Sequence, residues 1–231
     1  MIRNLNNISI SIIIPTLNEQ SNIDSLLNYL LQMDNHLQLI VADAGSKDNT
    51  VAAAEKVCQV IQTPPGRGIQ MNRGAEAAKG DIFWFLHADC RPHLDSIQAM
   101  KQVLVDASVV GGGFEYNLDQ PGWQFRLVEF LSNRKNRLLK WLFGDMGIFV
   151  RREIFERMGG YQEIPLMEDM DFSKRLKQYG KIAILPQRMN TSARRWIEEG
   201  YVLNSIRSWA LQSAWALGAS PDTLAKFYKF K

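Results

Sequence analysis

The sequence predicts an α/β fold, a doubly wound and mainly parallel sheet with helices on both faces. Short runs of apolar and β-branched residues alternate with segments of helical periodicity over residues 8–106. The apolar runs are continuous, as in parallel strands that are buried on both faces. Polar residues, glycines and prolines separate the two kinds of segment. This alternation is typical of successive βα units that share one sheet.

Four strand and helix pairs are expected in this first half. The strands are predicted at residues 8–15, 37–43, 60–64 and 81–86. The first helix follows Asn18, a residue type that can cap it. The other helices are predicted at residues 46–57, 68–80 and 94–106. Gly80 is expected to end the helix at 68–80, because glycine is the usual residue beyond a helix C-terminus.

The second half is less regular. We expect strands at residues 109–118 and 181–186, and a strand followed by a short helix within residues 147–161. Glycines in the segment 109–118 indicate that another backbone passes close to it. Helices are predicted at residues 123–143 (one long helix or a pair), 170–180 and 199–218. We expect one domain over residues 1–231, with halves at about 8–106 and 107–198 and a helical tail at about 199–231.

Composition narrows the classes of protein. A chain of 231 residues removes roughly 70% of its unfolded surface from water, enough for a large core. A net charge of +3 does not indicate the strongly basic surface of a nucleic-acid-binding protein. Cys58 and Cys90 have no disulfide or metal spacing, which favours a reduced, cytoplasmic compartment. The first nine residues contain no apolar signal region, and no apolar run approaches the roughly 20 residues that span a bilayer.

Basic charge is concentrated in two places. Residues 188–231 carry 7 basic and 3 acidic side chains, against 20 and 21 in the rest of the chain. Arg134, Lys135, Arg137 and Lys140 form a second cluster, interleaved with apolar residues of the helix at 123–143. Interfacial docking on a membrane is one interpretation. We favour the alternative, a helix that packs its apolar side on the domain. The segment "RSWALQSAWALG" has the same two interpretations, and a homodimer contact is a third.

Acidic residues stand where predicted strands stop: Asp43, Asp89 and the pair Glu168–Asp169. Strand ends of an open α/β sheet meet at one crevice, where ligands bind. Asp43 precedes "AGSKDNT", a turn whose backbone N–H groups can face an anion. A purely turn-forming role for Asp43 is the alternative.

Asp89 has the chemistry of a ligand for a hard cation such as Mg²⁺ or Mn²⁺. If the segment is still extended, His87 points the same way as Asp89. For His87 we favour a hydrogen bond to protein or phosphate over metal ligation. Glu168, Asp169 and Asp171 are close enough in sequence to raise a pKa, which suits a general base. The alternative is that they begin a helix, where acidic residues are favourable.

Six segments occur in a specific order: "SIIIPTLNE", "VADAGSKDNT", "GRGIQMNRGAEAAKGD", "FLHAD", "GDMGIFVRREIFERMGGY" and "MEDMDF". Together they resemble a family 2 glycosyltransferase with the GT-A fold, over about residues 10–195. The subgroup that they resemble is the small, soluble bacterial transferases with HAD in place of DXD. The resemblance makes residues 8–106 the nucleotide-binding half and residues 107–198 the acceptor half.

The resemblance also implies roles for individual residues. Asp169 would be the general base, and Asp89 would bind Mg²⁺ or Mn²⁺. Donor contacts would come from Pro15, Thr16, Glu19, Asp43, Gly45, Ser46, Arg67, His87 and Ala88. Acceptor-side residues would be Gly144, Asp145, Glu168, Arg195 and Trp196. "SARRW" has Ser192 where processive members carry the glutamine of QxxRW, which argues against a processive polymerase. A neutral His87 in place of a carboxylate implies weak metal affinity without nucleotide.

The function that follows is metal-dependent, inverting transfer of a sugar from a nucleotide-sugar donor, by default a UDP-sugar, to an acceptor hydroxyl. The acceptor itself is not specified by the sequence. A cytoplasmic location is expected, with peripheral contact on the inner face of the membrane as an alternative. A nucleotidyltransferase is a second hypothesis, but "PTLNEQSN" lacks the glycine and basic residues of its usual loop. A non-catalytic binder of nucleotide sugars is a third.

Overall fold

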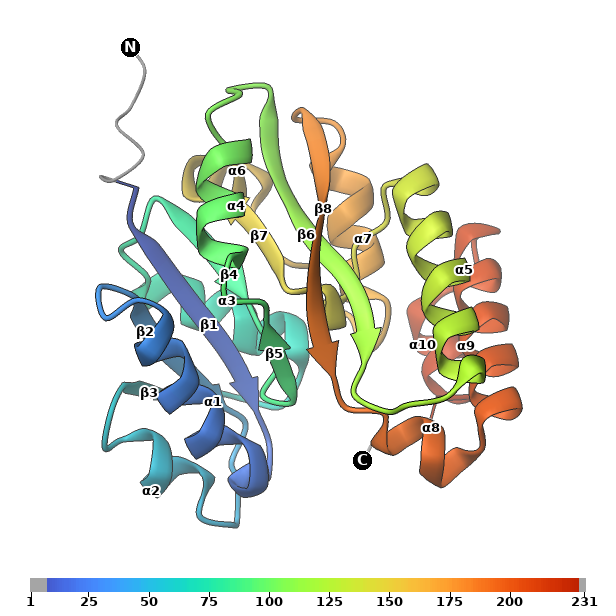
Figure 1. The fold of residues 1–231 in the computed structure, drawn as a ribbon, viewed down its shortest axis with the longest axis horizontal. Helices are drawn as coiled ribbons and strands as arrows, with labels where there is room; N and C mark the ends of the chain where they lie inside the picture. The colour runs from blue at the N-terminus through green and yellow to red at the C-terminus, as the bar shows by residue number, and fades with distance from the viewer. Residues whose placement is uncertain (1–7, 229–231) are drawn as a thin grey trace.

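Eight strands form one sheet with helices on both of its faces (Figure 1). The computed structural model describes residues 8–228. The strand order is β3-β2-β1-β4-β7-β6-β8-β5. The strands are β1 (Ile10–Thr16), β2 (Gln38–Asp43), β3 (Gln59–Gln62), β4 (Ile82–Phe85), β5 (Cys90–Pro92), β6 (Val109–Leu118), β7 (Ile148–Arg151) and β8 (Lys181–Thr191).

The helices connect these strands and extend the chain beyond β8. They are α1 (Gln20–Met33), α2 (Thr50–Ala54), α3 (Arg67–Ala77), α4 (Ser96–Val103), α5 (Trp123–Leu139), the 3₁₀ helix η2 (Gly144–Met146), α6 (Arg152–Met158), α7 (Glu168–Leu176), α8 (Arg194–Glu199), α9 (Tyr201–Ala216) and α10 (Pro221–Ala225). None of the helices within residues 8–228 is long and apolar enough to cross a membrane. The expectation that no signal region opens the chain falls mainly on residues 1–7, outside the described part.

The predicted doubly wound sheet is confirmed. Strands β3, β2, β1 and β4 are mutually parallel, and β6 is parallel to β8. β7 is antiparallel to both of its neighbours, β4 and β6, and β5 is antiparallel to β8. The connections from β1 lead to β2 on one side, and β4 lies on the other. The carboxyl ends of β1 and β4 therefore border the switch point at which α/β sheets bind ligands.

Two hydrophobic cores sandwich the sheet. On one face α1 and α4 bury Ile23, Leu27 and Met100 against the strands. On the other face α3, α5, α6 and α7 bury a second cluster that includes Phe155 and Phe172. A third, smaller cluster joins α7, α9 and α10 through Met170, Leu211 and Leu224. Burial on both faces explains why the strands read as continuous apolar runs.

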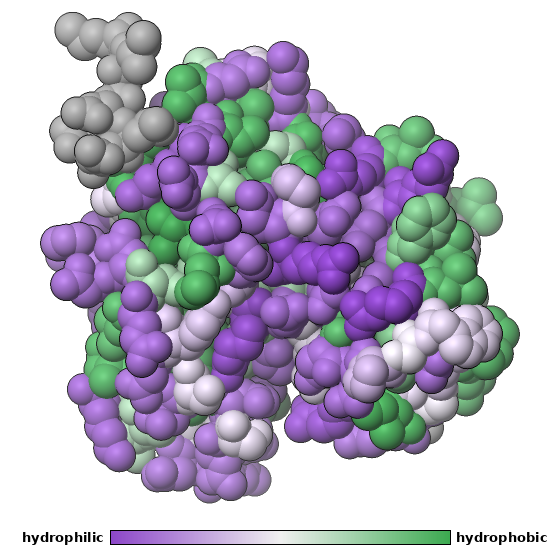
Figure 2. Space-filling model, in the orientation of Figure 1, coloured by the Kyte–Doolittle hydropathy of each residue, from purple (hydrophilic) through white to green (hydrophobic). Residues whose placement is uncertain are grey.

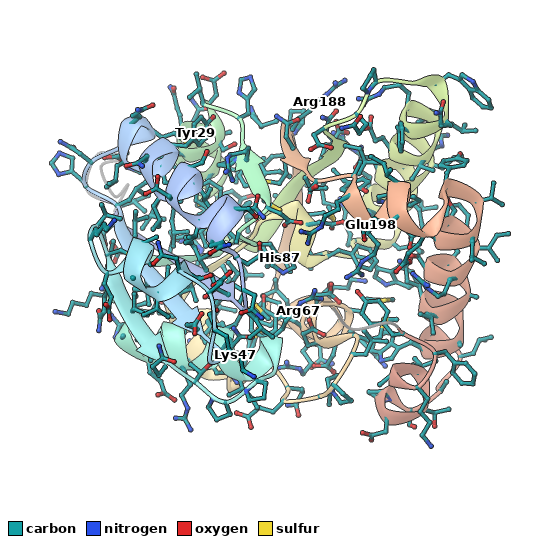
Figure 3. The ribbon with its side chains drawn as sticks, turned by 90° about the horizontal axis from the view of Figure 1, so that it is seen from below. Tyr29, Lys47, Arg67, His87, Arg188 and Glu198 are labelled. Carbon is teal, nitrogen blue, oxygen red and sulfur yellow. The ribbon has the colours of Figure 1, made fainter. Side chains whose placement is uncertain are left out.

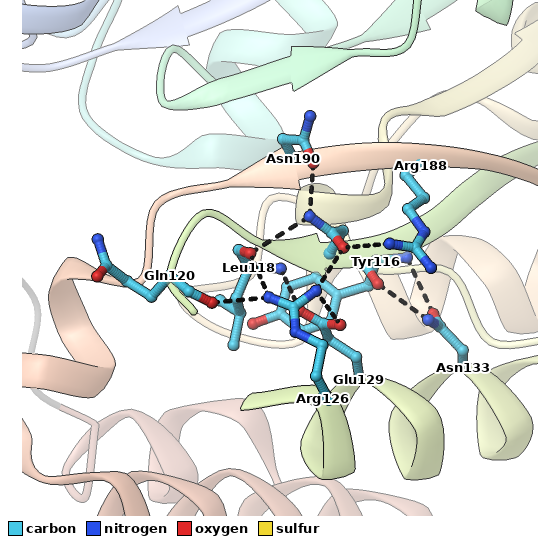
Figure 4. Close-up of polar contacts among 9 residues, drawn as sticks. Tyr116, Leu118, Gln120, Arg126, Glu129, Asn133, Arg188 and Asn190 are labelled. Carbon is cyan, nitrogen blue, oxygen red and sulfur yellow. Dashed lines mark hydrogen bonds and ion pairs between the residues drawn. The ribbon is translucent and has the colours of Figure 1, made fainter. Parts of the chain in front are cut away.

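Side chains of α5 satisfy the backbone of β6 where no strand does. β7 pairs with β6 only at Gly111 and Gly112, which leaves later backbone groups of β6 without a strand partner on that side. Asn133 accepts a hydrogen bond from the Tyr116 backbone N–H and donates one to the Tyr116 carbonyl, both at 2.9 Å. Glu129 accepts from the Leu118 N–H at 2.7 Å (Figure 4). Buried backbone groups need such partners, so these contacts fix which side of α5 faces the sheet.

Arg126 strengthens the same attachment. Its guanidinium donates to Asn117 Oδ1 at 3.0 Å and to the Leu118 carbonyl at 2.9 Å. It also forms an ion pair with Glu129 at 2.8 Å. Arg188 donates to the same Asn117 oxygen from β8, so α5, β6 and β8 are joined through one buried amide (Figure 4).

Several sequence-based boundaries are wrong, and each has a local cause. Asn18 does not cap α1: it adopts φ +54° in the preceding loop, and Glu19 is the cap residue. Gly80 does not end α3, which stops at Ala77. A Cβ at Gly80 would instead lie 2.5 Å from the Ser11 backbone nitrogen, so this glycine permits close passage beside β1. β8 continues past Pro186 because the register with β6 shifts there, and an irregularity of this kind accommodates proline.

The glycines of β6 allow the centre of the sheet to close. A Cβ at Gly112 would collide with the Ala183 carbonyl oxygen on β8 and with the Phe149 ring on β7. We therefore expect Gly112→Ala to lower the free energy of unfolding by about 3 kcal/mol, because backbone on a neighbouring strand cannot move aside. Urea denaturation of the purified protein measures this loss.

Gly159→Ala is the matched control, since a Cβ there has nothing within 4 Å and only the φ of +74° is strained. Its expected cost is about 1–2 kcal/mol. Equal losses for the two variants would show that backbone freedom, rather than the close approach of strands, makes Gly112 necessary.

Candidate active site

The loop after β2 is built around the Asp43 carboxylate, which is fully buried. Its Oδ1 accepts hydrogen bonds from the backbone N–H groups of Gly45 at 2.9 Å and Ser46 at 2.8 Å. Its Oδ2 accepts from the Thr16 hydroxyl at 2.8 Å and from the Ser46 hydroxyl at 2.5 Å. These four contacts fill the usual capacity of a carboxylate. Asp43 therefore has the turn-forming role that the sequence left open, and direct contact with a nucleotide base stays a prediction.

The β1–α1 loop is tied to the β2–α2 loop. The Asn18 N–H donates to Ser46 Oγ at 2.8 Å, and the Lys47 N–H donates to Asn18 Oδ1 at 2.9 Å. The Glu19 N–H donates to Thr50 Oγ1 at 2.8 Å. These bonds hold the ends of β1 and β2 as one rigid rim, from which Pro15 and Thr16 border the switch point.

Helix α3 is hydrogen-bonded to the backbone of this rim. Gln70 is buried, and its amide donates to the carbonyls of Thr16 at 2.9 Å and Ala42 at 2.8 Å. The sequence interpretation missed Gln70, although its spacing of three from Arg67 places both on one side of a helix. Arg67, the first residue of α3, lies 3.9 Å from a Glu168 carboxylate oxygen.

The segment after β4 is a turn and not an extended strand. The Cys90 N–H donates to the His87 carbonyl at 3.1 Å, so residues 87–90 close on themselves. The premise that His87 and Asp89 share one strand face is therefore wrong. Arg91 holds the turn, donating to the carbonyls of Cys90 at 2.9 Å and of Asn22 on α1 at 3.2 Å. Nothing in the sequence pattern pointed to Arg91.

His87 packs directly on Gly144, where a Cβ would overlap the imidazole ring. This contact brings η2, which belongs to the second half of the chain, against the end of β4. Burial, with the positive charges of Arg67 and Arg195, lowers the pKa of His87 to about 3. The imidazole is therefore neutral near pH 7. Figure 3 shows His87 and Arg67 near the middle of the molecule, between the half that carries α1–α3 and the half that carries α8–α10.

Asp169 is held in the first turn of α7. Its Oδ2 accepts from the Gly144 N–H at 3.1 Å and its Oδ1 from its own neighbour, the Met170 N–H, at 2.7 Å. Burial raises its pKa and that of Glu168, while the two backbone donors limit the shift at Asp169. Glu168 and Asp169 do not follow a strand, as the sequence suggested, but a loop after α6. The alternative of a helix start is confirmed for both and for Asp171.

Asp145 of η2 adds a further carboxyl group to the place where the two halves of the chain meet, between His87, Gly144 and Asp169, which we call the crevice. Burial first, and then the charges of Asp169 and Asp89, raise its pKa to about 7. Asp89 in turn acts on Glu19, whose pKa is raised mainly by burial. Carboxylates from the loop after β1, the turn after β4, η2 and α7 thus influence one another across a short distance. Asp43 stands two strands away from β4, roughly 10 Å at the usual spacing, and belongs to the separate network of its own loop.

Positive charge reaches the same place from two elements. Burial opposes ionisation of Arg67, but Glu168, Tyr228 and Asp169 outweigh it and raise the pKa of its guanidinium. Arg195 at the start of α8 donates to the Tyr228 hydroxyl, and its guanidinium lies 5.0 Å from the centre of the Tyr228 ring. Tyr228 was not identified from the sequence, where no motif surrounds it.

Two of the residues chosen from the sequence do not face this crevice openly. Ala88 has its side chain in the core that contains Trp84, so only its backbone faces the turn. Trp196 packs against the second core, with its ring 6.3 Å from that of Tyr201. The structure brings eight of the other candidates together around η2: Arg67, His87, Asp89, Gly144, Asp145, Glu168, Asp169 and Arg195. The candidates Pro15, Thr16, Glu19, Asp43, Gly45 and Ser46 belong to the rim formed by the loops after β1 and β2.

The oxygen atoms available at this site suit a hard divalent cation. The carboxylates of Asp89 and Asp145 supply the oxygen ligands that Mg²⁺ and Mn²⁺ prefer. Within residues 8–228 no group of three or more His, Cys, Asp or Glu side chains is arranged around one metal position. A cation that takes one or two carboxylates and completes its shell with substrate phosphates needs no such cage.

Comparison with known sequences identifies a family. The sequence model described as Glycosyl transferase family 2 matches residues 11–159. Glycosyltransferase AglE of Haloferax volcanii is 24% identical over 66% of this chain and 55% of its own length. Glucosyl-3-phosphoglycerate synthase of Mycobacterium tuberculosis is 32% identical over 37% of this chain and 30% of its own length. The chain thus spans about half, or less, of the length of these curated relatives.

Solved structures share the fold. TarS of S. aureus superposes with a TM-score of 0.65 at 18% identity, over 80% of this chain and 36% of that one. Mannosyltransferase PcManGT from Pyrobaculum calidifontis, in complex with GDP-Man and Mn²⁺, gives a TM-score of 0.64 at 21% identity over 90% and 61% of the two chains. These superpositions support the predicted GT-A fold, a mixed α/β sheet with helices on both faces.

The carboxyl groups crowded around Asp145 lower the free energy of unfolding by an amount that depends on pH. The pKa of Asp145 rises from an ordinary 3.8 to about 7 in the folded state, so folding is favoured most where this group is protonated. That contribution is present below about pH 4 and is lost as the pH rises through 7. Asp145→Asn should therefore stabilise the protein by about 1–2 kcal/mol at pH 8 and by little at pH 4.

Thermal and urea unfolding of both proteins at the two pH values measure this difference. Asp24→Asn, at an exposed position of α1, is the control and should change stability by less than about 0.5 kcal/mol at either pH. An Asp145→Asn protein that is less stable than the wild type at pH 8 would contradict the repulsion described above.

Proposed function

The chain belongs to glycosyl transferase family 2, and on that premise we propose that it transfers a sugar from a nucleotide-sugar donor to an acceptor hydroxyl, with inversion at the anomeric carbon. The observation that carries the proposal is the placement of Asp169. Two backbone N–H groups fix its carboxylate beside Asp145 and Arg67, at the crevice beyond β1 and β4. A fixed carboxylate with a raised pKa is the group that an inverting transfer needs as a base.

In the proposed reaction Asp169 accepts the proton of the acceptor hydroxyl as its oxygen attacks the anomeric carbon. The leaving nucleoside diphosphate departs from the opposite side, so one carboxylate suffices and no covalent sugar intermediate forms. Glu168 pairs with Arg67 on the donor side of Asp169, so the two neighbouring carboxyl groups have different surroundings. This difference supports Asp169 as the base and Glu168 as the partner that positions Arg67.

Negative charge that develops on the leaving diphosphate needs positive charge near it. The guanidinium groups of Arg67 and Arg195 both lie near enough to His87 to act on it electrostatically, and they would provide that charge. The neutral imidazole of His87 can donate one hydrogen bond to a phosphate oxygen. A bound Mg²⁺ or Mn²⁺ would supply Lewis-acid stabilisation of the leaving group, with Asp89 as its protein ligand and Asp145 next to it.

The nucleotide would lie on the rim formed by Pro15, Thr16, Glu19 and the loop around Asp43, Gly45 and Ser46. Because Asp43 is saturated by hydrogen bonds, we propose that it acts mainly by holding Ser46 and the backbone of the loop for the base. A uridine diphosphate sugar is the first donor to test. Structural neighbours have been solved with UDP-GlcNAc and with GDP-Man, so a guanosine donor belongs in the same screen.

Replacement of Asp169 by asparagine tests the base directly. Asp169→Asn keeps the shape of the side chain but cannot take a proton. Its single amide oxygen can accept the hydrogen bond from Gly144 or the one from Met170 but not both, so the melting temperature of the variant is recorded as a control for folding. We expect turnover of the accepted donor to fall by about 10³-fold or more, while donor affinity changes little. Isothermal titration measures binding, and release of nucleoside diphosphate measures turnover.

Asp171→Asn is the matched control, because Asp171 lies two residues further along α7 and pairs with Arg175 at 2.7 Å instead of facing the crevice. Its turnover should stay within a few-fold of the wild type. Near wild-type turnover in Asp169→Asn would remove Asp169 as the base. Binding of nucleotide sugars with no turnover, in the wild type and with every acceptor tried, would support a binding protein instead.

The metal assignment has its own test. UDP-sugars and GDP-mannose should raise the melting temperature, because a ligand of the folded state stabilises it by mass action. The rise should be larger with Mn²⁺ present. Mn²⁺ alone should have little effect, because the part of the chain that the structure describes contains no group of three or more His, Cys, Asp or Glu side chains that could hold it. Asp89→Asn should abolish the Mn²⁺-dependent part and leave the nucleotide-dependent part. A strong shift with Mn²⁺ alone that persists in Asp89→Asn would place the metal elsewhere.

A further inference from the structure

Exposed apolar side chains are unevenly distributed over residues 8–228. Of the 18 large hydrophobic residues that the structure exposes, 13 lie within residues 123–139 and 197–227. Scattered exposed hydrophobic residues are normal, but a concentration of them in adjacent helices marks an interaction surface.

Helix α5 contributes a stripe along its outer side. Trp123, Leu127, Phe130 and Leu138 recur every three to eight residues and fall on one side of the helix. Trp123 is 75% exposed, Phe130 61% and Leu138 81%. The opposite side of α5 is committed to β6 through Glu129 and Asn133, so the helix cannot rotate to bury this stripe.

Helix α9 contributes a second stripe that lacks charge. Val202, Leu203 and Ile206 are each 62% exposed. The only charged residue of α9 is Arg207, which forms an ion pair with Glu199 of α8. The inner side of α9 packs on α7 and α10 through Leu211. A surface helix normally carries charges on its solvent side, so this face has the composition of a covered one.

The two stripes form one surface. α5 and α9 lie side by side, with the Phe125 and Tyr201 rings 6.2 Å apart at their starts. Lys135 of α5 lies 5.4 Å from the Trp209 ring of α9 further along. On each helix the exposed apolar residues lie roughly a third of a turn from this contact, at about 100° per residue, and point away from the sheet. Figure 2 shows hydrophobic residues over α5 and along the edge where α9 lies.

Charge indicates what covers this surface. Arg134 lies within the stripe of α5, exposed between Phe130 and Leu138, and Lys140 is exposed at its end. The only acidic residue of α5 is Glu129, which is buried against β6, and α9 has none. A second copy of the chain would bring the same basic side chains against one another. An anionic surface would match them.

We propose that the outer face of α5 and α9 docks on the surface of a bilayer that contains anionic lipid. Leucine, isoleucine and phenylalanine side chains enter the boundary of the acyl chains, and Trp123 and Trp209 lie at headgroup level. Arg134 and Lys140 extend to the phosphates while their methylene groups stay on the apolar surface. The surface is separate from the crevice, so the inference does not depend on the transferase activity.

Vesicle flotation of the full chain tests the proposal. The protein should float with vesicles of equal parts phosphatidylcholine and phosphatidylglycerol, and not with vesicles of phosphatidylcholine alone. Binding should weaken as salt is raised, because the electrostatic part is screened. Size-exclusion chromatography with light scattering, without lipid, should give a monomer.

Two double variants separate the apolar and the basic parts. Leu203→Ser with Ile206→Ser should lower partition into the anionic vesicles by about tenfold or more. Arg134→Glu with Lys140→Glu should do the same by reversing charge. Matched controls lie outside the surface: Leu94→Ser, at a residue that is 66% exposed, and Lys56→Glu with Lys79→Glu. They should bind as the wild type does.

Because all substituted side chains are exposed, the variants should keep the wild-type melting temperature, which the same experiment records. The proposal fails if the wild type floats with neither kind of vesicle or equally with both. It also fails if either surface variant binds as tightly as the wild type. A stable dimer that Leu203→Ser with Ile206→Ser dissociates would assign the surface to a second copy of the chain instead.

Discussion

The structure depends on one electrostatic constraint, the packing of Asp145, Glu168 and Asp169 around Arg67, with Asp89 close enough to act on Asp145. Each carboxyl group that loses water raises the cost of ionising the others, and Arg67 offsets only part of that cost. The backbone N–H groups of Gly144 and Met170 donate hydrogen bonds to Asp169 and so offset a further part of the cost of ionising it. The remaining excess of negative charge is what a divalent cation and its bound diphosphate would neutralise, so the same repulsion that weakens the folded chain prepares the crevice for a ligand.

The sheet order makes this packing geometrically feasible. Asp89 arrives on the turn after β4, whereas Asp145 arrives on η2 immediately before β7, the strand that pairs antiparallel to β4. The pairing places the end of one strand beside the start of the other. Close contact then requires Gly144, because a side chain there would overlap His87. A single glycine thus sets the distance between the two halves of the site, and His87 serves as the packing surface as well as a candidate phosphate donor.

Periodicity predicted the α/β class, and most elements, because strands buried on both faces leave continuous apolar runs. It could not place Arg91, Gln70 or Tyr228, whose contacts are with backbone or with residues distant in the chain. The family resemblance selected Arg67, Asp89 and Asp169 by position in motifs. It carried no information on Asp43 being saturated by its own loop, nor on the turn that separates His87 from Asp89, since both follow from hydrogen bonds that no spacing reveals.

Helix α9 connects the crevice to the proposed docking surface. Its inner side packs through Leu211 on Met167 and Met170, which flank Glu168 and Asp169 in the first turn of α7. One helix diameter, about 10 Å, therefore separates the apolar outer face from the helix that carries the candidate base. Because the side chains between α9 and α7 are close-packed, the two helices have little room to move relative to one another. If the outer face rests on a bilayer, α9 sets the height of the crevice above the lipid headgroups, and it would favour acceptors held at that height over those dissolved in bulk water.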